Sequence, residues 1–225
     1  MVSVCSTSEH LIWLCDAPVD WSATGDFWSG IGTMLGAVAV IYAARKGAST
    51  FQQWKQQKLG ERHIEQAERI MTAVDDARDA LKSVRSPMMW AHEEEAAKKK
   101  LIEGDEAGFN SNTAARQKRL VTAQAYFERL QRTRDKMLAL NQCRPMGRAF
   151  FGDEIEKAIG TLAHQFLVVQ TYAEASIDHE ERDDFGKKIW NALYYSDRNE
   201  DCEVTRATNE SVATLEAKLL PILRA

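Results

Sequence analysis

Basic side chains concentrate in residues 113–148 of this 225-residue chain. The segment has nine Lys or Arg residues against two acidic ones, a net charge of +7. Lys and Arg bind phosphate oxygens. A segment of this kind can therefore contact anionic lipid headgroups, at about 1 kcal/mol per residue near the surface, or the phosphates of RNA or DNA. The candidate contacts are Arg116, Lys118, Arg119, Arg129, Arg132, Arg134 and Lys136.

Neutralisation of this charge inside the protein is the alternative interpretation. Residues 174–203 hold ten acidic and four basic side chains, a net charge of −6. They can pair with the basic segment within one subunit or between subunits. We favour this interpretation, so nucleic acid stays an open but not a favoured partner.

Cysteine and histidine give no metal or redox signal. None of the four cysteines belongs to a C-x-x-C pair: Cys5, Cys15, Cys143 and Cys202. Cys5 and Cys15 can form a disulfide if the N-terminal tail faces an oxidising compartment, but we favour unpaired thiols. His63 and His179 have no ligand partner at useful spacing, and His164 lies in an apolar stretch where we expect a core residue. We therefore predict no metal site and no cofactor.

No Ser/His/Asp signature and no glycine-rich phosphate loop can be found in the sequence. A non-enzymatic role is favoured for this reason, and catalysis stays open.

Residues 27–44, FWSGIGTMLGAVAVIYAA, contain no charged side chain. A helix of this length spans ~27 Å, close to the hydrocarbon thickness of a bilayer. Aromatic residues flank the stretch, as in interfacial belts: Trp21, Phe27 and Trp28 before it and Tyr42, Phe51 and Trp54 towards and beyond its end. We predict a transmembrane helix. A buried core helix and a cleaved signal peptide are the alternatives, and the acidic residues that precede the stretch disfavour the signal peptide.

The charges on either side of this stretch predict its orientation. Residues 1–26 contain four acidic and no basic residues, whereas five basic residues follow the stretch: Arg45, Lys46, Lys55, Lys58 and Arg62. Positive flanks stay in the cytoplasm. We expect a single-pass protein of the inner (cytoplasmic) membrane, with the tail of residues 1–26 outside and the C-terminal domain in the cytoplasm.

Small residues recur on one face of the predicted membrane helix. Gly32 and Gly36 stand four residues apart, with Ser29 and Thr33 on adjacent turns. This spacing lets two helix backbones approach closely, so the face is a candidate for self-association into a homo-oligomer. An accidental match remains the alternative, because glycine is common in membrane helices.

The remainder of the chain has helical periodicity throughout. Apolar residues recur every three or four positions up to Val84, which predicts a stalk helix over residues 45–84. After a break at Arg85–Pro87, we expect helices over about 87–103, 113–142, 149–175, a short one around 185–193, and 205–223, with a loop at 104–112. The prediction is an all-α protein: one N-terminal transmembrane helix that continues into the stalk helix, followed by a cytoplasmic helical bundle in residues 85–225.

Arg85 and His92 stand at a helix junction and resemble the Arg-x(4–6)-His motif of HEPN ribonucleases. That family also has a helical bundle. The resemblance implies that the pair handles phosphate charge and proton transfer in metal-independent RNA cleavage. Pro87 and the bulky Met88, Met89 and Trp90 replace the usual polar residue after the arginine. The alternative role places Arg85 at the junction, Met88 to Trp90 in packing and His92 at the surface.

Residues 51–71, FQQWKQQKLGERHIEQAERIM, and the later RSPMMWAHEEE resemble small uncharacterised bacterial proteins with one N-terminal transmembrane helix. The architecture also resembles the HEPN-like membrane accessory proteins of RNA-targeting CRISPR systems, which assemble into pores. Three functions follow as hypotheses. The first is a self-associating scaffold or effector with a cytoplasmic protein partner, and the others are an oligomeric channel-forming antiviral defence effector and an RNase or RNA-binding module.

Overall fold

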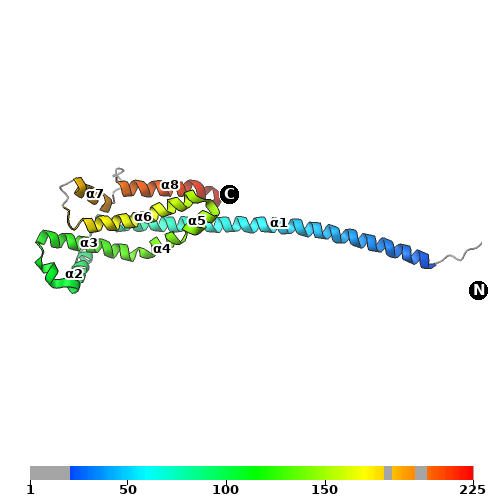
Figure 1. Cartoon of the computed structure of the whole chain (residues 1–225), viewed down its shortest axis with the longest axis horizontal. Coiled ribbons are helices and arrows are strands. Elements are labelled where there is room, and N and C mark those ends of the chain that lie inside the picture. The colour runs from blue at the N-terminus through cyan, green and yellow to red at the C-terminus, as the bar shows by residue number, and fades with distance from the viewer. Residues whose placement is uncertain (1–20, 180–183, 196–201, 225) are drawn as a thin grey trace, which may run out of the picture. The chain divides into compact units, whose positions relative to one another are not determined.

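The computed structural model describes residues 21–179, 184–195 and 202–224, with side chains from Trp28 onward. All regular structure in these residues is helical (Figure 1), which confirms the all-α prediction. The helices are α1 (Trp21–Val84), α2 (Ala91–Ser111), α3 (Ala114–Arg132), α4 (Arg134–Gln142), α5 (Arg144–Phe151), α6 (Asp153–Ala175), α7 (Asp184–Leu193) and α8 (Glu203–Leu223).

The chain divides into two units, Met1–Lys58 and Leu59–Ala225, and α1 contributes to both. In the first unit, every described side chain of α1 up to Lys58 is exposed except the half-buried Ile31. Across the described residues, no helix contains a stretch that is both long and apolar enough to count as a membrane span. The predicted anchor begins at Phe27, whose side chain lies outside the described part of the chain. Cys5 and Cys15, for which unpaired thiols are favoured over a disulfide, lie outside it as well.

Helix α6 is the centre of the second unit and contacts α3, α4, α5, α7 and α8. Its residues at steps of three and four are buried as predicted: Ile155, Ile159, Leu162, Phe166 and Val169. The buried face of α1 from Ala67 to Val84 belongs to the same core. His164 is exposed, so the prediction that it is a core residue was wrong. It falls between the buried rows of α6, where the helical period turns a side chain towards solvent.

The predicted loop at residues 104–112 is instead the last part of α2. Asp105 has non-helical backbone angles (φ −155°, ψ 86°), and its Oδ1 accepts the N–H of Gly108 at 2.9 Å. A side-chain acceptor of this kind starts a new helical turn, so the chain kinks and continues as a helix. Phe109 is then buried in a small second core with Ala97, Val121 and Ala125. The chain kinks at Asp105 and does not form a loop, because the helix that follows buries Phe109 against Val121 and Ala125 of α3.

Two helices that the sequence predicted to be continuous are divided. The first breaks at Thr133, between α3 and α4. The second breaks at Gly152, whose φ of 92° is a conformation that L side chains rarely adopt. The apolar spacing of residues 113–142 predicts that Leu138 faces the core. It is instead 44% exposed on α4, because a break in a helix changes which face its later residues present.

Candidate functional site

Arg85 lies at the C-terminal end of α1 and fastens α7 and α8 to it. The residue is 2% exposed. Its guanidinium donates to the carbonyls of Ala192 (2.6 Å), Asn191 (3.2 Å) and Tyr194 (3.4 Å), to Thr205 Oγ1 (3.1 Å) and to Cys202 Sγ (3.1 Å). The carbonyls in the last turn of a helix have no partner within the helix, so a cation there satisfies them and favours the helix dipole. Burial lowers the pKa of Arg85 from its ordinary value, and the neighbouring Cys202 acts in the opposite direction.

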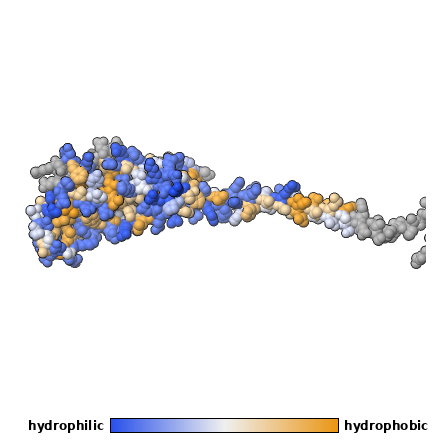
Figure 2. Space-filling view, viewed as in Figure 1, coloured by the Kyte–Doolittle hydropathy of each residue, from blue (hydrophilic) through white to orange (hydrophobic). Residues whose placement is uncertain are grey.

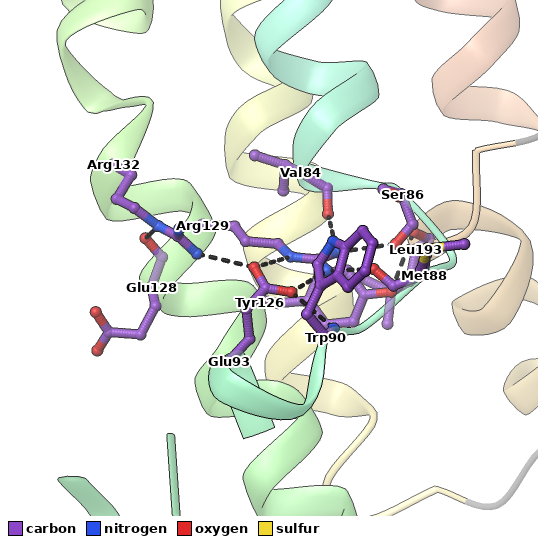
Figure 3. Close-up of polar contacts among 10 residues, drawn as sticks. All are labelled: Val84, Ser86, Met88, Trp90, Glu93, Tyr126, Glu128, Arg129, Arg132 and Leu193. Atoms are coloured by element: carbon purple, nitrogen blue, oxygen red, sulfur yellow. Dashed lines mark hydrogen bonds and ion pairs between the residues drawn. The ribbon is translucent and has the colours of Figure 1, made fainter. Parts of the chain in front are cut away.

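Arg129 of α3 holds the connection between α1 and α2. Its guanidinium donates to the carbonyls of Val84 (3.2 Å), Ser86 (2.8 Å) and Met88 (2.6 Å). The same group forms a two-pronged pair with the carboxylate of Glu93, at 2.7 and 3.1 Å. Figure 3 shows this carboxylate between the guanidinium groups of Arg129 and Arg132. The cluster explains why residues 85–90 have a fixed path although they form no helix.

Glu93 is the acidic member of this cluster, and its side chain is 9% exposed. The hydrogen bond from Arg129 is the largest cause that lowers its pKa from the ordinary 4.5 to about 2, and the N–H of Trp90 also contributes. The carboxylate is therefore ionised at neutral pH. Residues 93–100, EEEAAKKK, have Glu and Lys four residues apart, a spacing typical of a solvated helix face. The first residue of this run, Glu93, is instead part of the interior.

A cavity of about 540 Å³ opens between α2, α3 and α7. Its floor is apolar and comprises Tyr126, Ile189 and Leu193, all at most 3% exposed. The Tyr126 hydroxyl lies 3.4 Å from the carbonyl of Leu193, and burial raises the pKa of this tyrosine. Trp190 forms one wall and packs on Tyr194 with a centroid distance of 3.8 Å. The Arg129 cluster and the Arg85 hydrogen bonds fix the elements around this cavity.

Charged and polar side chains occupy the rim of the cavity. Lys118 and Arg119 come from α3, His179 follows α6, and Glu94 is the acidic contribution of α2. Arg119 Nε donates to the carbonyl of Ile177 at 2.9 Å, and the His179 ring packs on that of Phe185 at 4.8 Å. The combination of an apolar floor with a few polar groups at the rim is typical of small-molecule sites. This cavity is our candidate functional site.

The structure does not bring Arg85 and His92 into one cavity. Arg85 lines a small cavity with Arg78 and Thr208, whereas His92 is exposed on α2 and lines another one with Lys100 and Glu128. The hydrogen bonds of Arg85 go to protein acceptors, which is the junction role that the sequence left open. Met89 packs against the core, but Met88 and Trp90 are each 59% exposed, contrary to the expected packing of all three.

With partners among the described residues, four of the seven candidate phosphate contacts form ion pairs. The pairs are Arg116–Asp178 (2.9 Å), Arg129–Glu93 (2.7 Å), Arg132–Glu93 (3.0 Å) and Lys136–Asp76 (2.8 Å). Internal neutralisation therefore occurs, but in the described residues only Asp178 among these partners comes from the acidic segment 174–203. Lys118 lies at the cavity rim and Arg134 beside a separate apolar cavity on α3 and α4.

The predicted self-association residues lie on α1 in the first unit. Thr33 Oγ1 donates to the carbonyl of Ser29 at 2.9 Å, so this hydroxyl is satisfied within its own helix. A side-chain carbon added at Gly32 or Gly36 would meet no atom within 4 Å. Nothing in the described chain thus packs against these glycines.

Sequence reasoning missed Glu93, Tyr126 and Trp190 as parts of a site. Glu93 had one signal, its acidic side chain near a helix start, and it lies in the first turn of α2. The sequence had no signal for Tyr126 or Trp190, because they line one cavity only through the packing of α3 and α7.

Comparison with known proteins gave no relative: no family model, no curated protein and no solved structure matches the chain. In the described residues, no group of three or more His, Cys, Asp or Glu side chains is placed to hold a metal ion.

Proposed function

We propose that the protein is a self-associating, single-pass membrane protein whose cytoplasmic helical domain is a non-enzymatic interaction module. Residues 27–44 form the anchor, residues 1–26 lie outside, and residues 45–225 lie in the cytoplasm. Subunits meet through the face of Ser29, Gly32, Thr33 and Gly36. This is the scaffold or effector function that the sequence favoured.

The uncovered apolar surface of α1 is the observation that carries the proposal. Large apolar side chains in residues 28–42 are 54–75% exposed: Trp28, Met34, Leu35, Val38, Val40, Ile41 and Tyr42. Figure 2 shows orange and pale orange patches on this part of α1, next to the grey end. Water-soluble monomers rarely leave a continuous apolar surface of this kind bare. Lipid would cover it, and a helix satisfies its own backbone groups there.

The lack of contacts at Gly32 and Gly36 in the described chain supports self-association. Gly32 and Gly36 have no packing role in the described chain, and glycine lowers helix stability by about 1 kcal/mol relative to alanine. A partner helix that approaches closely would give them a role, because the lack of side chains lets two backbones pack.

Fractionation of cells that express the full chain tests the anchor. We expect the protein in the membrane pellet, resistant to carbonate extraction and released by detergent. Replacement of Val38 and Ile41 by Lys, which puts two charges in the apolar stretch, should move it to the soluble fraction or reduce its yield. Monodisperse wild-type protein in the high-speed supernatant without detergent would overturn the proposal.

Crosslinking in detergent tests self-association. Gly32→Leu with Gly36→Leu should reduce the oligomer, whereas Gly30→Leu should not. Gly30 is the matched control because steps of two and six residues turn it about 160° and 120° away from Gly32 and Gly36. All three changes raise helix propensity, so loss of the oligomer cannot come from a broken helix. Monomers only in the wild type would count against assembly.

The structure gives less support to the RNase or RNA-binding hypothesis and to the channel-forming hypothesis. Arg85 is occupied by carbonyl acceptors and His92 lies elsewhere, so RNA cleavage has no shared pocket. No observation on the described residues favours a pore over an anchored scaffold.

A further inference from the structure

We propose that the cavity between α2, α3 and α7 binds a small planar aromatic anion. The candidate site supplies two kinds of contact on opposite parts of one ligand: an apolar and aromatic floor for the ring, and cationic side chains at the mouth for the negative group. The ligand class follows from this division.

The floor and wall select an apolar, flat group. Ile189 and Leu193 are buried and offer no polar side-chain atom, and the Tyr126 hydroxyl is turned to the carbonyl of Leu193. Trp190 stays 38% exposed although it is the largest side chain of α7. A half-exposed indole on a cavity wall gains most from a second flat ring, because aromatic pairs are attractive beyond the area they bury.

The rim selects a negative charge. Lys118 and Arg119 line this cavity, and among its described lining residues only Glu94 carries a carboxylate. Among the described residues, no carboxylate lies within ion-pair distance of Lys118, and its side chain is exposed. Arg116, Arg129 and Arg132 of α3 differ in this respect, since each forms an ion pair, and Arg119 donates to the carbonyl of Ile177. Lys118 is therefore the cation of α3 that can serve a ligand without breaking a pair of the fold.

The size of the cavity limits the ligand. A volume of about 540 Å³ lies within the range of ordinary small-molecule sites. It accommodates a fused ring system with one sulfonate, carboxylate or phosphate, and it excludes a folded macromolecule. Because Lys118 and Trp190 line the same cavity, a ring and an anionic group on one small molecule can contact both.

Calorimetric titration of the full-length protein in nanodiscs of zwitterionic phosphatidylcholine tests the proposal, with empty nanodiscs as the blank. The probe is naphthalene-2-sulfonate, a planar aromatic anion. The comparison probes are inorganic sulfate, which has the charge without the ring, and octanoate, which has an acyl chain in its place. We expect saturable binding of the naphthalene probe only.

Lys118→Glu should weaken this binding about tenfold or more, since it replaces a charge-assisted contact by a repulsive one. Lys157→Glu is the matched control, because Lys157 is an exposed lysine of α6 that lines none of the cavities described above. Its affinity should equal that of the wild type. A fluorine NMR signal of 5-fluorotryptophan at Trp190, assigned with Trp190→Phe, should shift on saturation with the probe.

Absence of both heat and a Trp190 shift would overturn the proposal, as would equal binding by octanoate or unchanged affinity in Lys118→Glu. Failure of this proposal is distinct from failure of the anchor, because fractionation, crosslinking and incorporation into nanodiscs report on residues 27–44, whereas the titration reports on α3 and α7.

Discussion

At the scale of single residues, two buried arginines determine how the helical domain is connected. Arg85 holds the end of α7 and the start of α8, and Arg129 holds the segment between α1 and α2. Among the described residues no carboxylate pairs with Arg85, whereas Arg129 has the carboxylate of Glu93. The two sites should therefore respond differently to substitution and to pH.

Arg129→Met should destabilise the protein by about 3 kcal/mol, because it leaves the carbonyls of residues 84–88 and part of Glu93 without a donor inside the fold. Thermal unfolding of the full chain in detergent, followed by circular dichroism, measures the change. Arg134→Met is the control, since Arg134 is exposed on α4, and should be near neutral. Equal effects of the two would show that the Arg129 cluster adds nothing to stability.

The lowered pKa of Glu93 predicts that the folded protein loses stability in acid. Its pKa is lowered in the folded state, so its contribution is fully present above the ordinary pKa of 4.5 and is lost as the pH falls towards about 2. The melting temperature of the wild type should fall through this window. The melting temperature of Glu93→Gln should be lower than that of the wild type at pH 4.5 and should fall less as the pH is lowered to about 2. Equal falls in the two proteins would contradict this role of Glu93.

Thr205 and Thr208 of α8 form a matched pair of buried threonines. Thr205 accepts a hydrogen bond from Arg85, whereas the Thr208 hydroxyl is buried without a partner. Thr208→Val should raise the free energy of unfolding by about 1 kcal/mol, and Thr205→Val should lower it by about 1–2 kcal/mol. Denaturant unfolding of both variants checks the sign, and the same sign for both would refute this account.

At the scale of elements, α5 depends on a close approach to α6. A side-chain carbon at Gly147 would lie 3.0 Å from Ile159 Cδ1 and 3.2 Å from Ile155 Cγ2. Gly147→Ala should therefore destabilise the protein by about 1–2 kcal/mol despite its better helix propensity. Gly104→Ala in α2 meets no atom within 4 Å and is the control. Its melting temperature should not fall, and a fall similar to that of Gly147→Ala would make general helix effects the cause.

At the scale of the whole molecule, the second unit has a core of its own. Every residue of its two hydrophobic clusters lies at or beyond Ala67. A fragment of residues 59–225 should therefore fold alone, with helical circular dichroism, cooperative unfolding and solubility without detergent. Addition of residues 21–58 should make it associate with membranes. A fragment that is unfolded or aggregated would show that the first unit takes part in the core.

The sequence by itself determined the all-α class, the end of α1 at Val84 and the buried row of α6, because these depend on the local period of apolar residues. The uncharged stretch 27–44 and the basic residues after it are also features of the sequence alone, and the membrane anchor is proposed from them. Tertiary structure decided the kink at Asp105, the breaks at Thr133 and Gly152, the partners of Arg85 and Arg129, and the cavity beside Trp190. Each of these depends on which distant side chain lies opposite, and spacing along one helix does not contain that information.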